Sequence, residues 1–300
     1  MAIKLKRYDR NPVLTAIPDH PWESKHVSNA GAILRDGKVH ILYRAEGEDT
    51  RPSTWHTWPI SRLGLAISDD GFTISERLPD PVLDISGEEH PETDGVEDAR
   101  IAEIDSKYYV VYCTTSVFPE VLALATSDDL VHYEKHGTLM PDFSQRTGGL
   151  FPKKINGEFM LMHRVLPHIW ISRSSDLKEW HSSEVIWRTR PGHWTEIKMG
   201  IGATPIATDQ AWVVIIHGKD RSAVYRLGVM WLDLEDPTKV LRFQEEPILE
   251  PEEDYELHGF VGNAIYTCGA VVLDDELLVY YGCADTCLSV ATAKWRKFRL

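Results

Sequence analysis

The stretch AGAILRDGKVHILYRAEG, residues 30–47, sets a pattern that recurs along this chain of 300 residues. It contains a short apolar strand, a polar turn with Asp and Gly, and a second strand that is apolar and aromatic. Such a succession is typical of a β-hairpin. Four further copies follow along the chain, at residues 98–116, 149–164, 202–218 and 268–285.

A second strand of smaller residues follows each hairpin. These strands lie at residues 63–74, 122–137, 169–180, 225–237 and 288–295. Five copies of about four strands each, with almost no helical periodicity, predict a radial array of small sheets. A sandwich of two sheets would also give short alternating strands, but not the fivefold recurrence. We therefore expect an all-β fold, a five-bladed β-propeller in which residues 1–300 form a single domain and the N-terminal segment completes the last blade.

The composition is that of an ordinary soluble globular protein, with 43% apolar and 26% charged residues. The formal net charge of −14 argues against partners with extended negative charge, such as nucleic acid or an anionic membrane surface. Any bound phosphate must then be held by a local cluster of Arg and Lys side chains.

The sequence carries no targeting or cross-linking signal that we recognise. The first residues, MAIKLKRYDRNP, contain no apolar segment typical of a signal peptide, and no stretch approaches the length of a transmembrane helix. The four cysteines have no CxxC or zinc-site spacing: Cys113, Cys268, Cys283 and Cys287. We expect buried, reduced thiols and a cytoplasmic enzyme.

In a propeller the inner strands converge on a central axis, and ligands bind where they meet. The residues at matching ends of the predicted hairpins are therefore candidates for one shared site. These positions carry polar or charged side chains beside apolar strands: Asn29, Arg44, Asp98, Arg164, His217 and Asp285. A single charge at a strand end is normally a solvated rim residue, but six at equivalent positions of a radial repeat indicate a funnel.

Several segments taken together resemble glycoside hydrolase family 130, the β-mannoside phosphorylases and their hydrolytic relatives. They are SNAGAILRDGKVHILYRAEG, SRLGLAISDDG, GVEDARI, LFPKKINGEFMLMHR, KMGIGATPI with WVVIIHG downstream, YRLGVMWLDLEDP and CGAVVLDDELLVYYGCADT. The most specific are GVED-x-R, LFP-x-KI-x-G followed by HR, and K-x-G-x-G-x-x-P-I. The resemblance covers nearly the whole chain and implies a five-bladed propeller that acts on β-mannosides.

Five positions differ from the pattern that we associate with this family. Ala30 and Ala99 stand where proline is usual, and Gly148 and Gly149 stand where small alanines are usual. Lys153 replaces a common glutamate in LFP-x-KI. This charge reversal near the predicted site is expected to bear on the acceptor-sugar preference.

Cleavage of a glycoside requires a proton for the leaving oxygen and a nucleophile at the anomeric carbon. An inverting hydrolase needs two carboxylates, whereas a phosphorylase needs one, because phosphate is already an anionic nucleophile and is held by cations. The resemblance assigns the acid to Asp98, which would protonate the glycosidic oxygen through a hydroxyl of the bound mannose. The residues alone leave another interpretation open, in which Asp98 caps a turn or pairs with Arg100. Glu97 is expected to be a supporting ion-pairing or hydrogen-bonding residue.

A phosphate site is predicted at four bases that bracket two successive hairpins: Arg146, Arg164, Lys198 and His217. Arg146 precedes the third hairpin and Arg164 ends it, while Lys198 and His217 have the same positions in the fourth. Each base taken singly could be an ordinary surface residue. Together with the resemblance, they favour phosphate binding.

The sugar subsite is predicted at four polar residues: Asn29, Arg44, Arg62 and Asp285. Their side chains suit the hydroxyl groups of a mannosyl unit, although each could instead make a structural hydrogen bond between blades. No histidine pair has zinc-site spacing, and there is no Walker or dinucleotide-binding motif. We therefore expect no metal and no cofactor, with inorganic phosphate as a co-substrate.

These observations predict inverting phosphorolysis of a β-1,4- or β-1,2-linked mannoside, which gives α-mannose 1-phosphate and a shortened acceptor. The acceptor is open between mannose, glucose, N-acetylglucosamine and a longer chain. A β-mannoside hydrolase on the same scaffold and a non-catalytic glycan-binding propeller are the alternatives. The expected partners are an oligosaccharide and phosphate, and members of the family usually form oligomers.

Overall fold

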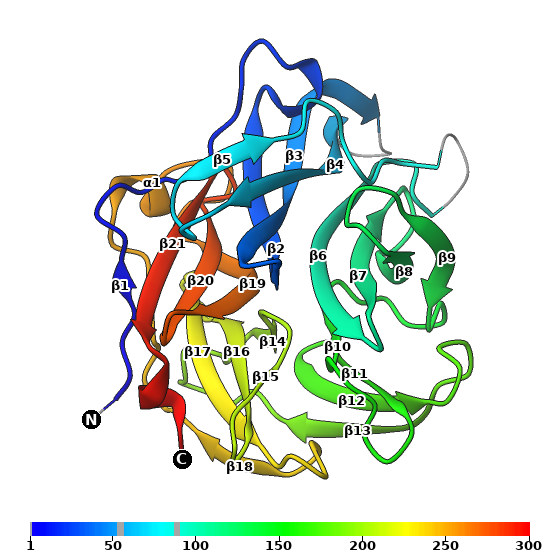
Figure 1. Cartoon of the computed structure of the whole chain (residues 1–300), viewed down its shortest axis with the longest axis vertical. Helices are drawn as coiled ribbons and strands as arrows, with labels where there is room; N and C mark the ends of the chain where they lie inside the picture. The colour runs from blue at the N-terminus through cyan, green and yellow to red at the C-terminus, as the bar shows by residue number, and fades with distance from the viewer. Residues whose placement is uncertain (1, 53–56, 87–90) are drawn as a thin grey trace.

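The computed structural model describes residues 2–52, 57–86 and 91–300 (Figure 1). Within these ranges the chain consists mainly of β-strands, with one four-residue helix, α1 (Asp254–Leu257). Two short 3-10 turns lie at Pro21–Glu23 and Trp295–Phe298. The expected all-β class is confirmed.

The strands of the described residues form five antiparallel runs, one for each predicted copy of the repeat. The first run is β2 (His26–Arg35), β3 (Lys38–Pro52), β4 (Thr57–Ser68) and β5 (Ile74–Arg77). The second is β6 (Gly95–Ile104), β7 (Lys107–Thr115), β8 (Val121–Ser127) and β9 (Glu134–Leu139). The third is β10 (Gly148–Leu150), β11 (Phe159–Val165), β12 (His168–Ser174) and β13 (His181–Trp187).

The fourth run is β14 (Lys198–Ile201), β16 (Trp212–Lys219), β17 (Tyr225–Leu232) and β18 (Val240–Phe243), with β15 (Ile206–Ala207) paired to β16. The fifth is β19 (Ile265–Leu273), β20 (Glu276–Cys283), β21 (Cys287–Lys294) and the N-terminal strand β1 (Lys6–Arg7). Figure 1 shows the runs arranged around a common centre, with the first strand of each run on the inside.

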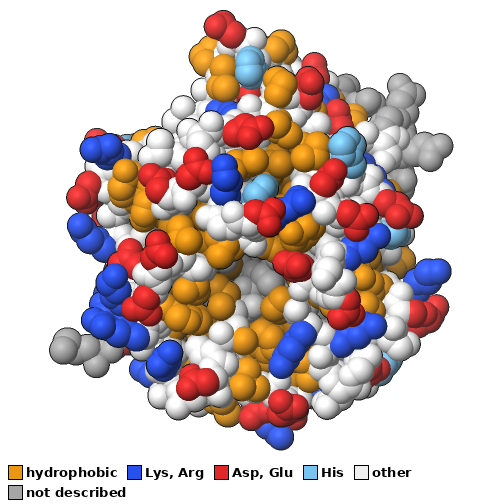
Figure 2. All heavy atoms as spheres, in the orientation of Figure 1, with side chains coloured by type: hydrophobic (Ala, Val, Ile, Leu, Met, Phe, Trp, Pro, Cys, Tyr) orange, Lys and Arg blue, Asp and Glu red, His pale blue; other side chains and the backbone are white. Residues whose placement is uncertain are grey.

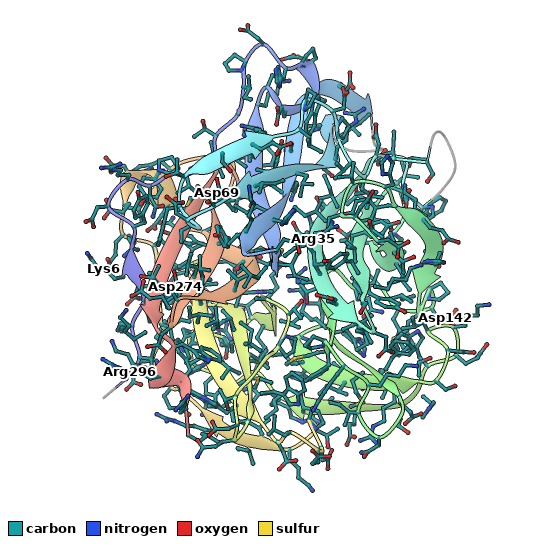
Figure 3. The ribbon with its side chains drawn as sticks, in the orientation of Figure 1. Lys6, Arg35, Asp69, Asp142, Asp274 and Arg296 are labelled. Atoms are coloured by element: carbon teal, nitrogen blue, oxygen red, sulfur yellow. The ribbon has the colours of Figure 1, made fainter. Side chains whose placement is uncertain are left out.

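The hydrogen bonds connect these runs into four sheets, because a parallel bridge between Ser61 and Gly95 joins the first run to the second. At the other end of the chain, β1 pairs with β21, with Lys6 opposite Thr292. The termini therefore lie on one flank of the molecule, where Figure 3 labels Lys6 and Arg296. The expectation that the N-terminal segment completes the last run is confirmed.

Five hydrophobic clusters among the described residues hold neighbouring runs together. Leu42 of the first run packs in one cluster with Val110 of the second. Another cluster contains Tyr43 of the first run and Val290 of the fifth, so the last run packs against the first. The remaining three clusters join the second run to the third, the third to the fourth and the fourth to the fifth. Apolar burial between the runs thus fixes their order around the centre.

Side-chain caps hold the polar turns between the outer strands, at SDDG (68–71), SDDL (127–130) and SSDL (174–177). Asp70 Oδ1 accepts hydrogen bonds from the backbone N–H groups of Phe72 at 2.8 Å and Thr73 at 2.7 Å. Asp129 and Asp176 accept equivalent bonds in the next two runs. Each carboxylate satisfies donors that the turn leaves without a strand partner.

The distribution of surface charge and the state of the cysteines can be compared with the expectations from the sequence. On the face shown in Figure 2, acidic side chains lie among the basic ones, with apolar residues between them. The four cysteines are unpaired and buried. In the described part of the chain, no helix has the length and apolar character needed to cross a bilayer.

Candidate active site

A cavity of about 830 Å³ lies among the inner strands. Seven of the nine residues predicted for the site line it: Asn29, Arg44, Asp98, Arg146, Arg164, Lys198 and Asp285. The other two, Arg62 and His217, are not among its described lining residues. The lining residues come from all five runs and the loops beside them, so the repeat does converge on one shared site.

Asp98 reaches the cavity because β6 carries a β-bulge. In the pairing of β6 with β7, Asp98 and Ala99 together oppose the single residue Tyr112. Asp98 has a φ of 56°, in the left-handed region that residues other than glycine seldom adopt. A bulge turns a side chain out of the regular alternation of its strand. Here it directs a side chain that is only 3% exposed into the cavity lining.

A matching bulge in β2 contains Ala30, so both alanines that replace the usual prolines lie in bulges. Asn29, with a φ of 45°, and Ala30 oppose the single residue Tyr43. Ala30 and Ala99 are both fully buried and lie outside the cavity lining. A Cβ atom added to Gly31 would lie 2.5 Å from the Ala99 carbonyl oxygen, so the two inner strands approach closely here. The alanines are thus backbone packing positions.

Asn29 joins two carboxylates across the cavity wall. Its Nδ2 donates to Asp98 Oδ1 at 3.0 Å and to Asp285 Oδ1 at 3.2 Å. Asp285 lies in the turn between β20 and β21. Burial raises the pKa of the Asp285 carboxyl, and Arg44 opposes this rise. The predicted sugar-site residues therefore form one hydrogen-bonded group with the predicted acid.

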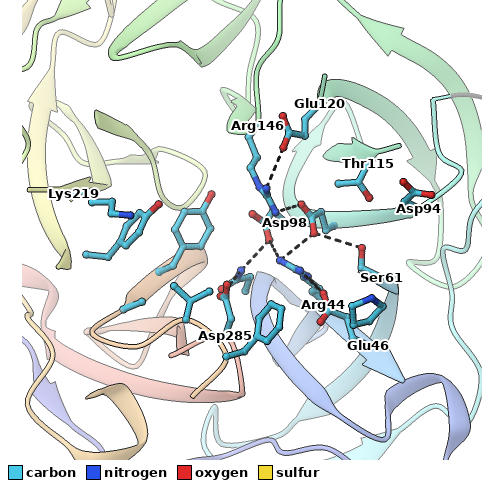
Figure 4. A pocket seen from close by; sticks show the side chains of 18 of the residues that line it. Arg44, Glu46, Ser61, Asp94, Asp98, Thr115, Glu120, Arg146, Lys219 and Asp285 are labelled. Carbon is cyan, nitrogen blue, oxygen red and sulfur yellow. Dashed lines mark hydrogen bonds and ion pairs between the residues drawn. The ribbon is translucent and has the colours of Figure 1, made fainter. Parts of the chain in front are cut away.

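Arg44 and Arg146 are held by carboxylates (Figure 4). Arg44 Nη1 lies 3.0 Å from Glu97 Oε2 and 3.7 Å from Asp98 Oδ1, and Arg44 Nε donates to Glu46 Oε1 at 2.9 Å. Arg146 donates to the other oxygen of Glu97. Burial raises the pKa of Glu97, whereas Arg146 and Arg44 lower it. The expected ion-pairing role of Glu97 is confirmed.

A second group of cations, Arg164, Lys198 and Lys219, lies on the third and fourth runs. None of the three forms an ion pair within 4.0 Å with a carboxylate of the described residues. Arg164 Nη1 lies 3.3 Å from His217 Nε2, and Arg164 Nε has no hydrogen-bond partner in the described structure. This group presents positive charge to the cavity without an ion pair to a described carboxylate.

Burial and repulsion from neighbouring cations lower the pKa values of Arg164 and Lys198. Burial lowers the pKa of Arg164, and Arg146 lowers it further. The pKa of Lys198 falls to about 8, chiefly through burial and then through Arg164 and Lys219. An anion bound between these side chains would relieve both effects.

Lys219 is a lining residue that the sequence analysis missed. It is the register partner of Lys198 in the pairing of β14 with β16. Both Nζ atoms lie over the ring of Tyr225, at 5.3 Å and 4.9 Å from its centroid. A sequence signal was available, since Lys219 lies two residues after His217 and so on the same side of a strand.

His217 lies behind the cavity wall and supports Arg164. It is fully buried, and its Nε2 accepts the hydrogen bond from Arg164 Nη1. Burial, Arg164 and Arg100 hold its pKa well below the usual value, so the imidazole is neutral at pH 7. Neutral His217 can accept from Arg164 without adding positive charge. Its predicted contact with phosphate stays a prediction.

Arg62 points away from the cavity because of strand register. Arg44 pairs with Leu63, and consecutive residues of a strand face opposite sides, so Arg62 and Arg44 lie on opposite faces. Arg62 donates instead to Asp84 Oδ1 at 2.8 Å and Asp49 Oδ2 at 2.9 Å. This position argues against the predicted direct contact of Arg62 with sugar.

Lys153 also lies outside the cavity lining. Its Nζ is 5.2 Å from the centroid of the Trp212 ring, with which it makes a cation–π contact. The position therefore gives no support to the expected effect of Lys153 on the acceptor sugar. Gly149 has a packing role, since a Cβ atom added there would lie 3.2 Å from Arg100 Cβ.

Other polar residues of the lining carry no pattern that singles them out in the sequence. They are Glu46, Ser61, Asp94, Thr115, Ser116, Glu120, Tyr225 and Tyr266. Glu46 and Ser61 lie within β3 and β4, and the others lie near strand ends or in loops. Strand register and loop packing decide which of these side chains reach the cavity. Among the residues that the structure describes, no group of three His, Cys, Asp or Glu is arranged to hold a metal ion.

Comparisons with known proteins agree with this geometry. A family model described as beta-1,4-mannooligosaccharide phosphorylase matches residues 5–298. The 1,2-beta-oligomannan phosphorylase of Thermoanaerobacter sp. (strain X514) is 42% identical over 300 residues, which cover 99% of each chain. The beta-1,4-mannooligosaccharide phosphorylase of Ruminococcus albus is 28% identical over 301 residues, covering 95% of this chain and 87% of that relative.

Among solved structures, the fold is similar to that of beta-1,2-mannobiose phosphorylase from Listeria innocua in complex with beta-1,2-mannobiose. The TM-score is 0.88 at 28% sequence identity, and the match covers 98% of both chains.

Proposed function

Because this chain belongs to glycoside hydrolase family 130, and the relatives described above are named as mannoside phosphorylases, we propose that it cleaves β-mannosides by inverting phosphorolysis. The family resemblance inferred from GVEDARI and the other segments is confirmed. The chain is thus an enzyme of the glycosyltransferase-type phosphorylase class.

One observation carries the proposal. A buried acid, Asp98, lines the same cavity as three cations that have no described carboxylate partner, Arg164, Lys198 and Lys219. A hydrolase would need a second carboxylate to deprotonate water, and Glu97, which adjoins Asp98, is held between Arg44 and Arg146. Unbalanced cations suit an anionic nucleophile such as phosphate, which charge-assisted hydrogen bonds hold and orient.

The reaction follows from these positions. A phosphate oxygen attacks C1 of the mannosyl unit on the face opposite the aglycone, and the bond from C1 to the glycosidic oxygen breaks. The departing oxygen receives a proton that originates on Asp98, through a mannose hydroxyl as in the family. The configuration inverts to give α-mannose 1-phosphate. Hydrogen phosphate releases one proton as its oxygen bonds to C1, and the uptake of one proton by Asp98 restores the acid, so the net reaction is balanced.

Asn29, Arg44 and Asp285 are proposed to bind the mannosyl unit, because they surround Asp98 in one hydrogen-bonded group. Arg146 borders both this group and the cations, so it is proposed to bind phosphate with Arg164, Lys198 and Lys219. We propose no metal and no cofactor beyond phosphate as co-substrate.

For the linkage we propose β-1,2. The relative named for β-1,2-linked oligomannan is 42% identical to this chain, whereas the one named for β-1,4 linkages is 28% identical. The β-1,4 linkage remains the second candidate, since the family model carries that description.

The same evidence supports the finer architecture. We propose that the five antiparallel runs are the blades of a five-bladed β-propeller that forms a single domain over residues 1–300. Support comes from the hydrophobic clusters between successive runs, one of which joins the fifth run to the first. A cytoplasmic location and a homo-oligomer are also proposals, and neither is needed for the chemistry.

Incubation with β-1,2-mannobiose and with β-1,4-mannobiose, each with and without phosphate, tests the function. We expect α-mannose 1-phosphate only when phosphate is present, formed faster from the β-1,2 substrate. Release of free mannose at the same rate without phosphate would identify a hydrolase, and no turnover of any β-mannoside would leave a glycan-binding protein. Faster cleavage of the β-1,4 substrate would overturn the linkage alone.

A further inference from the structure

Arg100 is a buried residue of β6, two positions beyond Asp98. It is 1% exposed. Its Nη1 donates to the Asp98 carbonyl oxygen at 2.7 Å, and its Nε to the Gly202 carbonyl oxygen at 2.9 Å. Its Nη2 donates to the Ile201 carbonyl oxygen at 3.0 Å and to the Tyr266 hydroxyl at 2.9 Å.

These partners are unusual for a buried charge. Within the described residues, no carboxylate lies within 4.0 Å of the Arg100 nitrogens, and three of its four acceptors are backbone carbonyl oxygens. Burial of an arginine without a carboxylate is costly, so a residue needed only to fill space here would be apolar. The planar fork of the guanidinium can instead fix several carbonyl groups at once.

The first of these carbonyl groups belongs to the residue whose conformation most needs support. Asp98 adopts a left-handed φ of 56° in the bulge, and such a conformation persists only when surrounding groups hold it. Asn29 holds its side chain from one side, and Arg100 holds its carbonyl oxygen from the other. Loss of Arg100 would free the bulge to relax and move the carboxyl group.

Two of the other three acceptors lie on or just after β14 of the fourth run, and the third lies on the fifth run. Ile201 is the last residue of β14, the strand that begins with Lys198, and Gly202 follows it. Tyr266 lines the cavity and belongs to β19. Arg100 therefore connects the backbone of the proposed acid to the strand that carries a proposed phosphate ligand.

We propose that Arg100 is a positioning residue that fixes the Asp98 carboxyl group relative to bound phosphate and the leaving oxygen. This inference rests on the proposed role of Asp98 as the acid. Arg100 does not line the cavity, so it acts through Asp98 and not by contact with substrate.

A leaving-group comparison separates positioning from a merely structural role. Phosphorolysis by Arg100→Lys is measured with β-1,2-mannobiose, whose departing oxygen must be protonated, and with 2,4-dinitrophenyl β-mannoside, whose leaving group needs no proton. Lys retains the charge but cannot bridge the three carbonyl groups. We expect kcat to fall about 100-fold on mannobiose and less than about fivefold on the dinitrophenyl substrate, within the range of general acid catalysis.

Asp98→Asn is the matched control, and it should show the same preference more strongly. If Asp98→Asn loses activity selectively on mannobiose but Arg100→Lys loses it equally on both substrates, the positioning role is wrong and the proposed function stands. If Asp98→Asn keeps wild-type turnover of mannobiose, the proposed function itself fails.

Should Arg100→Lys not fold, as judged by its thermal melt, Tyr266→Phe removes one of the four acceptors and answers the same question. It should lower kcat on mannobiose by a larger factor than on the dinitrophenyl substrate. An equal effect on both substrates, or none on either, would overturn the proposal.

Discussion

The two halves of the cavity are built on opposite electrostatic principles. On the half formed by the first, second and fifth runs, Arg44 lies within ion-pair distance of Glu46, Glu97 and Asp98. On the half formed by the third and fourth runs, Arg164 and the two lysines have no carboxylate of the described residues within 4.0 Å. Figure 4 shows Lys219 on the side of the cavity away from Ser61 and Glu46.

This difference indicates what each half is built to do. Paired charges inside a protein hold one another in fixed geometry, which suits the orientation of a neutral sugar and an acid. Cations that repel one another destabilise the empty site, and only an anionic ligand removes that cost. Arg146 lies at the boundary, because it pairs with Glu97 and Glu120 and also lines the cavity.

Among the substitutions considered, Asp98→Asn, in the half of the cavity that contains the carboxylates, should reduce activity the most. Asn has nearly the same shape but cannot donate an acidic proton, so we expect kcat for β-1,2-mannobiose to fall by about 10²–10⁴-fold. The KM for phosphate should change little, because the cations are intact. Initial rates of α-mannose 1-phosphate release check this. A raised KM with unchanged kcat would instead place Asp98 in binding.

Arg164→Met, in the half of the cavity that contains the cations without a described carboxylate partner, should weaken phosphate binding with an intermediate effect. The substitution removes the charge but keeps much of the side-chain volume. A hydrogen bond to a charged group contributes about 1.5–3 kcal/mol, so the KM for phosphate should rise by about 10- to 150-fold. Arg62→Met is the matched control, because Arg62 faces Asp49 and Asp84 outside the cavity. Its KM for phosphate should stay within about twofold of the wild-type value. Equal effects of the two substitutions would contradict the assignment.

The pH dependence of phosphate binding gives the smallest and most selective test. Burial and neighbouring cations lower the pKa of Lys198 to about 8, so its ammonium is charged below that pH and loses its proton above it. The KM for phosphate should therefore rise by several-fold between pH 7 and pH 9. Lys198→Arg remains protonated and should flatten that rise. An identical profile in the two enzymes would exclude Lys198 as the titrating group.

The sequence was informative wherever the signal is local. An apolar strand, a polar turn and an aromatic strand specify a hairpin through alternation and turn chemistry alone, and their recurrence gave the five runs. The motif GVEDARI pointed to Asp98 before its surroundings were known. The pairing of Arg146 and Arg164 with one hairpin likewise placed both residues on the cavity.

Local sequence patterns do not predict strand register or the backbone conformation of a bulge. The sugar subsite predicted from the sequence includes both Arg44 and Arg62, but the pairing of Arg44 with Leu63 puts the two arginines on opposite faces. Lys219 became part of the site because it pairs with Lys198. The bulge at Asp98 depends on close contact between β2 and β6, which no single strand encodes.

The sequence by itself therefore determined the hairpins, the all-β class and the kind of chemistry, because alternation, turns and motif residues act over a few positions. Only the tertiary structure decided which side chains meet. A one-residue difference in register reverses the face of a side chain, and the charge balance of a cavity is a sum over strands far apart in the chain.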